Sequence, residues 1–114
     1  MQAPSLVIHV HGAHPGTVTA GLRTARNART ALPDTPIEVV VQGGAVAELT
    51  STAELATAIT AAHSDHGIEV LACANSLRAV GIAAQDLTAG VTTVPVAVTH
   101  LAQRQWAGWA YVRV

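Results

Sequence analysis

The chain contains no lysine and no phenylalanine, and aromatic residues make up only 3% of its 114 residues. Its core must therefore be built from Ala, Val, Leu and Ile, which suits helices layered on a sheet. The six arginines are balanced by seven carboxylates, giving a net charge of −1. Because no basic tail or basic-aromatic interleaving occurs, we expect no nucleic-acid partner.

Charged residues are also scarce, at 11% of the chain against about a quarter in typical proteins. So little surface charge favours self-association, and we expect a homo-oligomer. No apolar run approaches the roughly 18 residues of a membrane span, so no membrane partner is expected. No basic segment precedes Leu6 to Val10, as it would in a signal peptide, and one cysteine excludes an internal disulfide. These features predict a cytoplasmic protein.

Apolar runs alternate with helical patterns along the chain. Strands are predicted at Ser5 to His11, Ile37 to Gln42, Ile68 to Cys73, Val91 to Val94 and Trp109 to Val114, with helices from about Pro15 to Leu32, Ser51 to Gly67, Leu77 to Val80 and Pro95 to Ala107. This alternation predicts one domain, residues 1–114, with an α/β fold. We expect a three-layer α/β/α sandwich of flavodoxin-like architecture, with a five-stranded, mostly parallel sheet.

Two local patterns predict where the second helix begins and which face of the first helix is exposed. Ser51 with Glu54 three residues later is a capping-box pattern that predicts the start of the second helix. Arg23, Arg26 and Arg29 lie opposite the apolar stripe of the first helix. They predict a solvated face, or alternatively a surface that meets acidic groups of a neighbouring subunit or partner.

The only cysteine, Cys73, stands where the third predicted strand gives way to a short helix. Asn75 and Ser76 are good N-caps, so backbone N–H groups and the helix dipole should favour a thiolate there. We therefore expect a partly exposed, nucleophilic thiol, with Arg78 as a nearby positive charge. The alternative is a small buried side chain, the common state of free cysteine.

Ligands in such folds meet the carboxyl ends of the parallel strands. Here those ends carry His11-Gly12, Gly43-Gly44, Cys73 and Pro95. We expect a flexible turn at Gly43-Gly44. We therefore take Cys73 as the catalytic candidate, supported by Asn75, Ser76, Arg78 and His11. No second cysteine exists that could form an internal disulfide with Cys73.

The stretches ACANSLRAVGI, AQDLTAGVTTVP and WAGWAYVRV, together with Asn27, resemble the DsrE/DsrF-like family of small proteins related to intracellular sulfur oxidation. The resemblance implies the five-stranded parallel DsrEFH-like sandwich and assembly into trimers or hexamers. It also implies that Cys73 carries sulfur as a persulfide in sulfur relay between a donor and an acceptor protein. Because no second cysteine exists to resolve that persulfide as an internal disulfide, a sulfur carrier is favoured over a complete enzyme. Val96-Ala97 depart from the small Ser-Gly-like pair expected after the proline, which should reshape the pocket beside the sulfur.

A second candidate site is the histidine cluster His9, His11 and His14. Its spacing can supply two or three zinc or copper ligands, with Cys73 as a fourth if the first and third strands are neighbours. His9 lies within an apolar strand, where a neutral hydrogen-bonded imidazole is favoured over a ligand. We therefore expect no metal and no other cofactor.

Three interpretations remain open at this point. The first, which we favour, is a sulfur-relay protein carrying sulfane sulfur on Cys73. The second is a small metal-binding protein that uses the histidine cluster. The third is an assembly subunit without chemistry of its own. No Gly-x-Ser-x-Gly elbow, phosphate-binding loop or dinucleotide-binding glycine motif supports another enzyme class.

Overall fold

A computed structural model describes residues 3–114, which fold around one parallel sheet. Its strands are β1 (Leu6–His11), β2 (Ile37–Gln42), β3 (Ile68–Cys73), β4 (Val91–Val94) and β5 (Ala110–Arg113). They lie in the order β4-β3-β2-β1-β5, and every neighbouring pair is parallel. The predicted five-stranded α/β fold is confirmed, and the sheet is parallel throughout.

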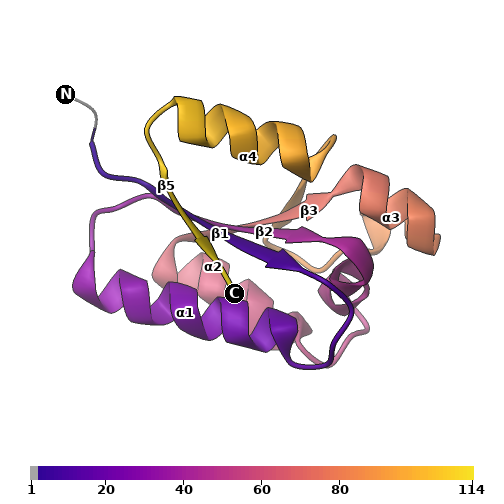
Figure 1. Cartoon of the computed structure of the whole chain (residues 1–114). Helices are drawn as coiled ribbons and strands as arrows, with labels where there is room; N and C mark the ends of the chain where they lie inside the picture. The colour runs from indigo at the N-terminus through magenta and orange to yellow at the C-terminus, as the bar shows by residue number, and fades with distance from the viewer. Residues whose placement is uncertain (1–2) are drawn as a thin grey trace.

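Helices cover both faces of the sheet. They are α1 (Thr17–Ala31), α2 (Ala56–His66), α3 (Ala74–Val80) and α4 (Ala97–Trp106). In Figure 1, α1 and α2 lie below the sheet, α4 lies alone above it, and α3 follows β3 at the carboxyl ends of the strands. None of these helices is long and apolar enough to cross a membrane.

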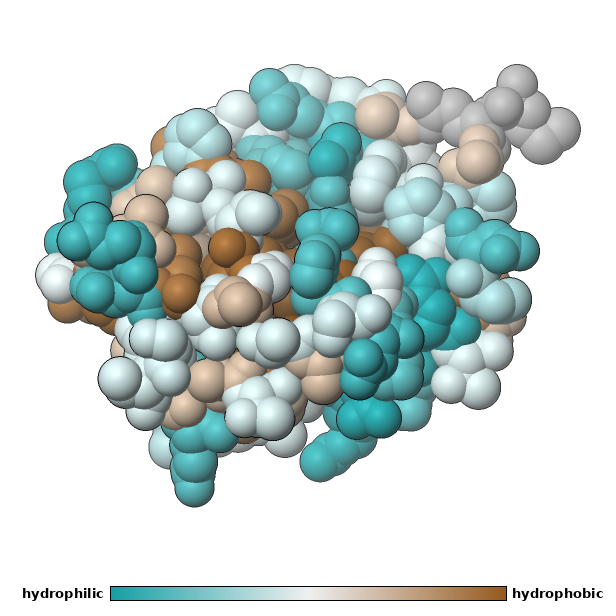
Figure 2. Space-filling view, turned by 180° about the vertical axis from the view of Figure 1, so that it is seen from behind, coloured by the Kyte–Doolittle hydropathy of each residue, from teal (hydrophilic) through white to brown (hydrophobic). Residues whose placement is uncertain are grey.

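The two faces of the sheet bury different amounts of apolar surface. Close approach of α1 to the sheet requires a glycine, since a Cβ on Gly21 would lie 2.5 Å from a methyl group of Val10. The larger core lies between the sheet and α1, α2 and α3, whereas the smaller core under α4 contains Val7, Val40, Leu71, Cys73, Val94, Ala97 and Leu101. Figure 2, seen from behind, shows hydrophobic side chains gathered in a band at the level of the sheet.

Three local predictions are wrong. The helix predicted from Ser51 begins at Ala56, after Leu55, because the Ser51 N–H instead bonds the Asp86 carbonyl at 2.9 Å and the residues between form turns. The flexible turn expected at Gly43-Gly44 is the start of a 3₁₀ helix, η1 (Gly43–Leu49). The N-cap of α3 is Cys73 itself, so neither Asn75 nor Ser76 is the cap.

Candidate functional site

Cys73 occupies two structural roles at once. It is the last residue of β3 and the N-cap of α3, with an extended backbone at φ −69° and ψ 114°. Its side chain lies on the α4 face of the sheet, within the smaller core. The sulfur therefore meets the start of α3 and, across the chain, the start of α4.

The sulfur accepts hydrogen bonds at these two helix starts. The Ala97 N–H donates to Cys73 Sγ over 3.4 Å, and the Asn75 N–H donates to the Pro95 carbonyl over 3.3 Å, which ties the two starts together. Burial disfavours the thiolate, but the Ser76 hydroxyl and the N–H groups of Ser76, Ala97 and Asn75 outweigh it. The pKa of Cys73 therefore lies below its ordinary value.

The expected partial exposure of Cys73 is wrong for this chain, because the residue is only 2% exposed. Ala97, fully buried, packs against it at the first turn of α4. Val96-Ala97, the pair that departs from the family pattern, thus stands directly beside the sulfur.

Ser76 links the sulfur to the neighbouring strand end. Its hydroxyl oxygen accepts a hydrogen bond of 2.8 Å from the Gly43 N–H, which leaves the hydroxyl proton for Cys73. Gly43 needs to be glycine, because its φ is +73° and a Cβ there would lie 2.9 Å from His11. His11 therefore contacts the site indirectly, by packing on the turn that positions Ser76.

The remaining predicted supporting residues lie on the exposed side of α3. Arg78 donates to the Asn75 side-chain oxygen over 3.1 Å, and both residues are exposed. Asn75 contributes its backbone N–H to the thiolate environment. The structure thus brings Ser76, Asn75 N–H and Ala97 N–H together at the sulfur, and engages the Arg78 guanidinium with Asn75.

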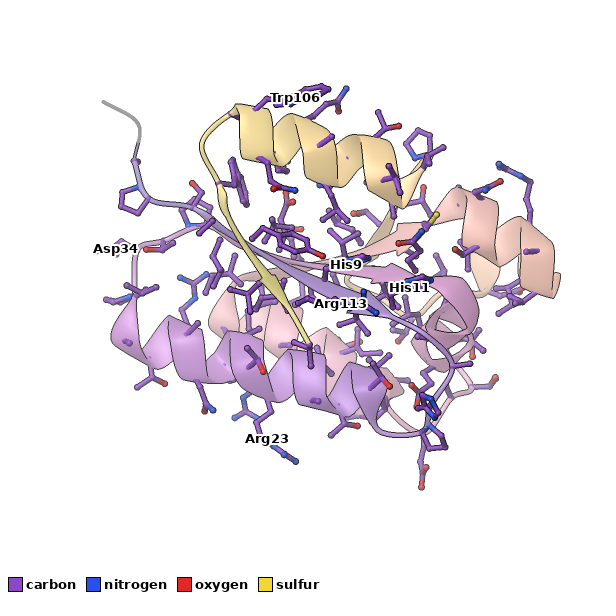
Figure 3. The ribbon with its side chains drawn as sticks, in the orientation of Figure 1. His9, His11, Arg23, Asp34, Trp106 and Arg113 are labelled. Atoms are coloured by element: carbon purple, nitrogen blue, oxygen red, sulfur yellow. The ribbon has the colours of Figure 1, made fainter. Side chains whose placement is uncertain are left out.

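The histidine cluster is divided. His9 has both ring nitrogens occupied, Nδ1 by the Tyr111 hydroxyl at 2.6 Å and Nε2 by the Gln42 amide oxygen at 2.8 Å. Because that amide oxygen only accepts, His9 Nε2–H donates to it and Tyr111 O–H donates to Nδ1. His11 stacks on His9 with ring centroids 5.8 Å apart, and both lie at the sheet in Figure 3.

Burial lowers the pKa of His9, and the nearby charges of His11 and Arg113 lower it further. The hydrogen bond to Gln42 acts in the opposite direction but does not outweigh them. His14 lies beyond the strand and is exposed. Cys73 could be a fourth metal ligand only if β1 and β3 were neighbours. Strand β2 lies between them, so this expectation is wrong. Within residues 3–114, no three His, Cys, Asp or Glu side chains are grouped to hold a metal ion.

Sequence reasoning missed a buried ionic cluster beneath α4. Glu38, 6% exposed, accepts bonds from Arg104 at 2.7 and 3.1 Å and pairs with His100 at 2.8 Å. Arg104 also lies over the Trp109 ring at 4.5 Å. The signal was a carboxylate inside the apolar strand IEVVVQ, since a buried charge requires a partner.

The fold and site define a class of small parallel three-layer α/β/α proteins with a cysteine between strand and helix. The model of the DsrE/DsrF-like family matches residues 6–114, and the chain belongs to this family. The resemblance seen in the sequence is thereby confirmed. No curated protein matches the chain.

Two solved structures are similar over nearly the whole chain. One is MTH1491 of Methanobacterium thermoautotrophicum, a protein of unknown function, with 30% identity and a TM-score of 0.90 over 98% of this chain and 100% of that one. The other is YchN of E. coli, with 17% identity and a TM-score of 0.83 over the same shares. Because the sequence identity is only 17%, the similarity to YchN supports the assignment of the fold and nothing further.

Proposed function

We propose that this protein is a sulfur-relay carrier that holds sulfane sulfur as a persulfide on Cys73. The observation that carries the proposal is the set of donors around the sulfur. The Ala97 N–H lies 3.4 Å from Sγ, and the Ser76 hydroxyl and the amides of Ser76 and Asn75 join it in lowering the pKa of Cys73. Donors that stabilise a thiolate also stabilise the more acidic persulfide anion.

Loading is a sulfur transfer that needs no external oxidant. The Cys73 thiolate attacks the outer sulfur of a donor persulfide, forming the new S–S bond. The donor's own S–S bond breaks, and its electron pair leaves with the donor as a thiolate. The proton that the donor persulfide carried stays with the transferred sulfur or passes to water.

Unloading runs in the opposite sense. An acceptor thiolate attacks the outer sulfur of the Cys73 persulfide, and Cys73 Sγ departs as a thiolate into the hydrogen bonds of Ser76 and Ala97. A leaving thiol of lowered pKa departs faster. With no second cysteine in the chain, the acceptor thiol belongs to a partner protein. A free thiol of this kind suits the reducing cytoplasm.

Access to Cys73 requires the first turn of α4 to swing away. Beyond its first turn, α4 is held on the sheet by the pairing of His100 and Arg104 with the buried carboxylate of Glu38. The start of α4 is held by two uncharged hydrogen bonds, from the Ala97 N–H to the sulfur over 3.4 Å and from the Asn75 N–H to the Pro95 carbonyl over 3.3 Å. This asymmetry favours opening at the sulfur end, with the far end of the helix remaining on the sheet.

One observation favours a second candidate. Cys73 is 2% exposed, as expected for a side chain that only packs the core. Under this alternative the protein is an assembly subunit without chemistry of its own, and sulfur donors leave it unchanged.

A transfer assay tests the proposal. The protein is incubated with a low-molecular-weight polysulfide, desalted, and mixed with a thiol acceptor, and the sulfane sulfur on each partner is measured by cyanolysis. The carrier should pass its sulfur to the acceptor, while Cys73→Ser carries none. Absence of transferable sulfur on a folded wild-type protein supports the assembly-subunit alternative instead.

A further inference from the structure

A concave site lies on the opposite face of the sheet from Cys73. It is a groove between α1 and α2 with a volume of about 430 Å³. This falls within the usual range of small-molecule pockets. The residues lining it are Thr19, Leu22, Arg23, Arg26, Asn27, Thr30, Leu55, Ala58 and His66. We call it the α1–α2 groove.

The α1–α2 groove gathers positive charge without a carboxylate. Two of the six arginines of the chain, Arg23 and Arg26, line it, and His66 lies across from them at the end of α2. Neither arginine makes a salt bridge or a side-chain hydrogen bond within residues 3–114, in contrast to Arg29, Arg78 and Arg104. Figure 3 shows Arg23 extending from α1 away from the sheet.

Arg23 and Arg26 are exposed side chains that carry like charges. Arg23 and Arg26 are three residues apart, so they are neighbours on one helix face and repel each other. Arg29, one turn further, has a structural role: it donates to the carbonyls of His66 at 2.8 Å and Thr35 at 2.6 Å. Arg29 therefore has hydrogen-bond partners within the fold, whereas the described residues offer none to the guanidinium groups of Arg23 and Arg26.

The rest of the lining defines the ligand further. Leu22, 5% exposed, and the half-buried Leu55 give the groove an apolar floor, while Asn27 and Thr30 supply neutral hydrogen-bonding groups. A guanidinium binds carboxylate or phosphate through two parallel hydrogen bonds. From these features we propose that the α1–α2 groove binds a small organic anion, with its phosphate or carboxylate on Arg23 and Arg26 and its apolar body on Leu22 and Leu55.

Titration followed by amide NMR shifts tests the site. Phenyl phosphate, benzoate and inorganic phosphate are the charged probes, and benzyl alcohol is the uncharged one. The aromatic anions should shift amides of α1 and α2 at millimolar concentration or below, and more strongly than benzyl alcohol. Comparing phenyl phosphate with benzoate shows which anionic group the site prefers.

Substitution supplies the decisive comparison. Arg26→Gln should raise the Kd of the preferred aromatic anion about tenfold, the loss of a charge-assisted hydrogen bond. Arg113→Gln, the same charge change on β5, should alter it less than twofold. Circular dichroism confirms that both variants are folded.

Several results would overturn the proposal. They are equal binding of benzyl alcohol, an unchanged Kd in Arg26→Gln, or shifts confined to the starts of α3 and α4. Dissociation of an oligomer by Arg26→Gln would also overturn it, because the groove would then be covered by a second copy of the chain.

Discussion

Cys73 and Ser76 define the chemistry of the site at the scale of single residues. The hydroxyl of Ser76 is oriented by the Gly43 N–H, and it is the largest of the contributions that lower the pKa of the thiol. The hydrogen bond favours the thiolate because it stabilises the charged form only. The reactivity of Cys73 should therefore depend on Ser76, whose hydroxyl acts only through this hydrogen bond.

Iodoacetamide alkylation across pH measures this dependence. In the folded protein the midpoint for Cys73 should lie below that of the denatured chain. Ser76→Ala should raise the midpoint above that of the wild type, since it removes a hydrogen bond to the charged form. Ser64→Ala, an exposed serine of α2, should leave it unchanged. Labelling only after denaturation would identify an inert, buried thiol.

His9 predicts a pH dependence of stability. Its pKa is lowered in the folded state, so between the folded and unfolded pKa values the unfolded chain binds more protons. The free energy of unfolding should therefore fall as pH drops through the unfolded value of about 6.5. Chemical denaturation from about pH 7.5 to about pH 5.5 measures the fall, which should be smaller in His9→Gln than in wild type. The matched control is His14→Gln, whose profile should follow wild type; identical profiles for all three proteins would contradict the prediction.

Among the elements, α4 both packs on Cys73 and carries the partners of a buried carboxylate. Its first turn covers Cys73, while its later residues His100 and Arg104 bind the buried carboxylate of Glu38. Burying that carboxylate is tolerated because both of its oxygens are paired. The Glu38 cluster therefore holds the helix that covers the thiol.

Loosening α4 should expose Cys73. In Glu38→Gln the charge that binds Arg104 and His100 is lost, and the free energy of unfolding should fall by about 2–4 kcal/mol. Native alkylation of Cys73 should become faster. Glu69→Gln, an exposed carboxylate on the neighbouring strand, should change neither quantity appreciably. A lower free energy of unfolding without faster native alkylation would show that α4 does not control access.

At the scale of the whole molecule, apolar side chains remain exposed on α4 and β5. Trp106 is 82% exposed and Val98 62%, and every residue of β5 is exposed. In Figure 3, Trp106 projects from the outer side of α4. A surface of this kind, on a chain with few charges, marks an interaction site, and we propose that it joins copies of the chain into a trimer or hexamer.

Light scattering at micromolar concentration tests the assembly. No dominant monomer should appear in the wild type. Trp106→Glu should shift the mass toward the monomer by placing a charge in the apolar contact, whereas Leu32→Glu, equally charged and on the carboxyl end of α1, should not. A clean wild-type monomer would contradict the proposed assembly.

Much of this fold could be predicted, because the spacing of apolar residues along the sequence indicates which face of a helix or strand is buried. The five strands were found from apolar runs and the four helices from apolar spacing together with cap, proline and glycine signals, and Cys73 was correctly placed at the end of β3. Three features were not predictable, because they depend on contacts distant in sequence. The Ser51 N–H found a partner in Asp86, Ala97 covered the thiol, and Tyr111 bonded His9 across 102 residues.

The central claim is that Cys73 itself accepts sulfane sulfur, and intact-mass spectrometry tests it most directly. After incubation with a polysulfide donor, the native wild-type protein should gain the mass of one or more sulfur atoms. Dithiothreitol should remove that mass, and Cys73→Ser should never gain it, although serine keeps the fold. An unchanged wild-type mass, or an equal gain in Cys73→Ser, would contradict the account.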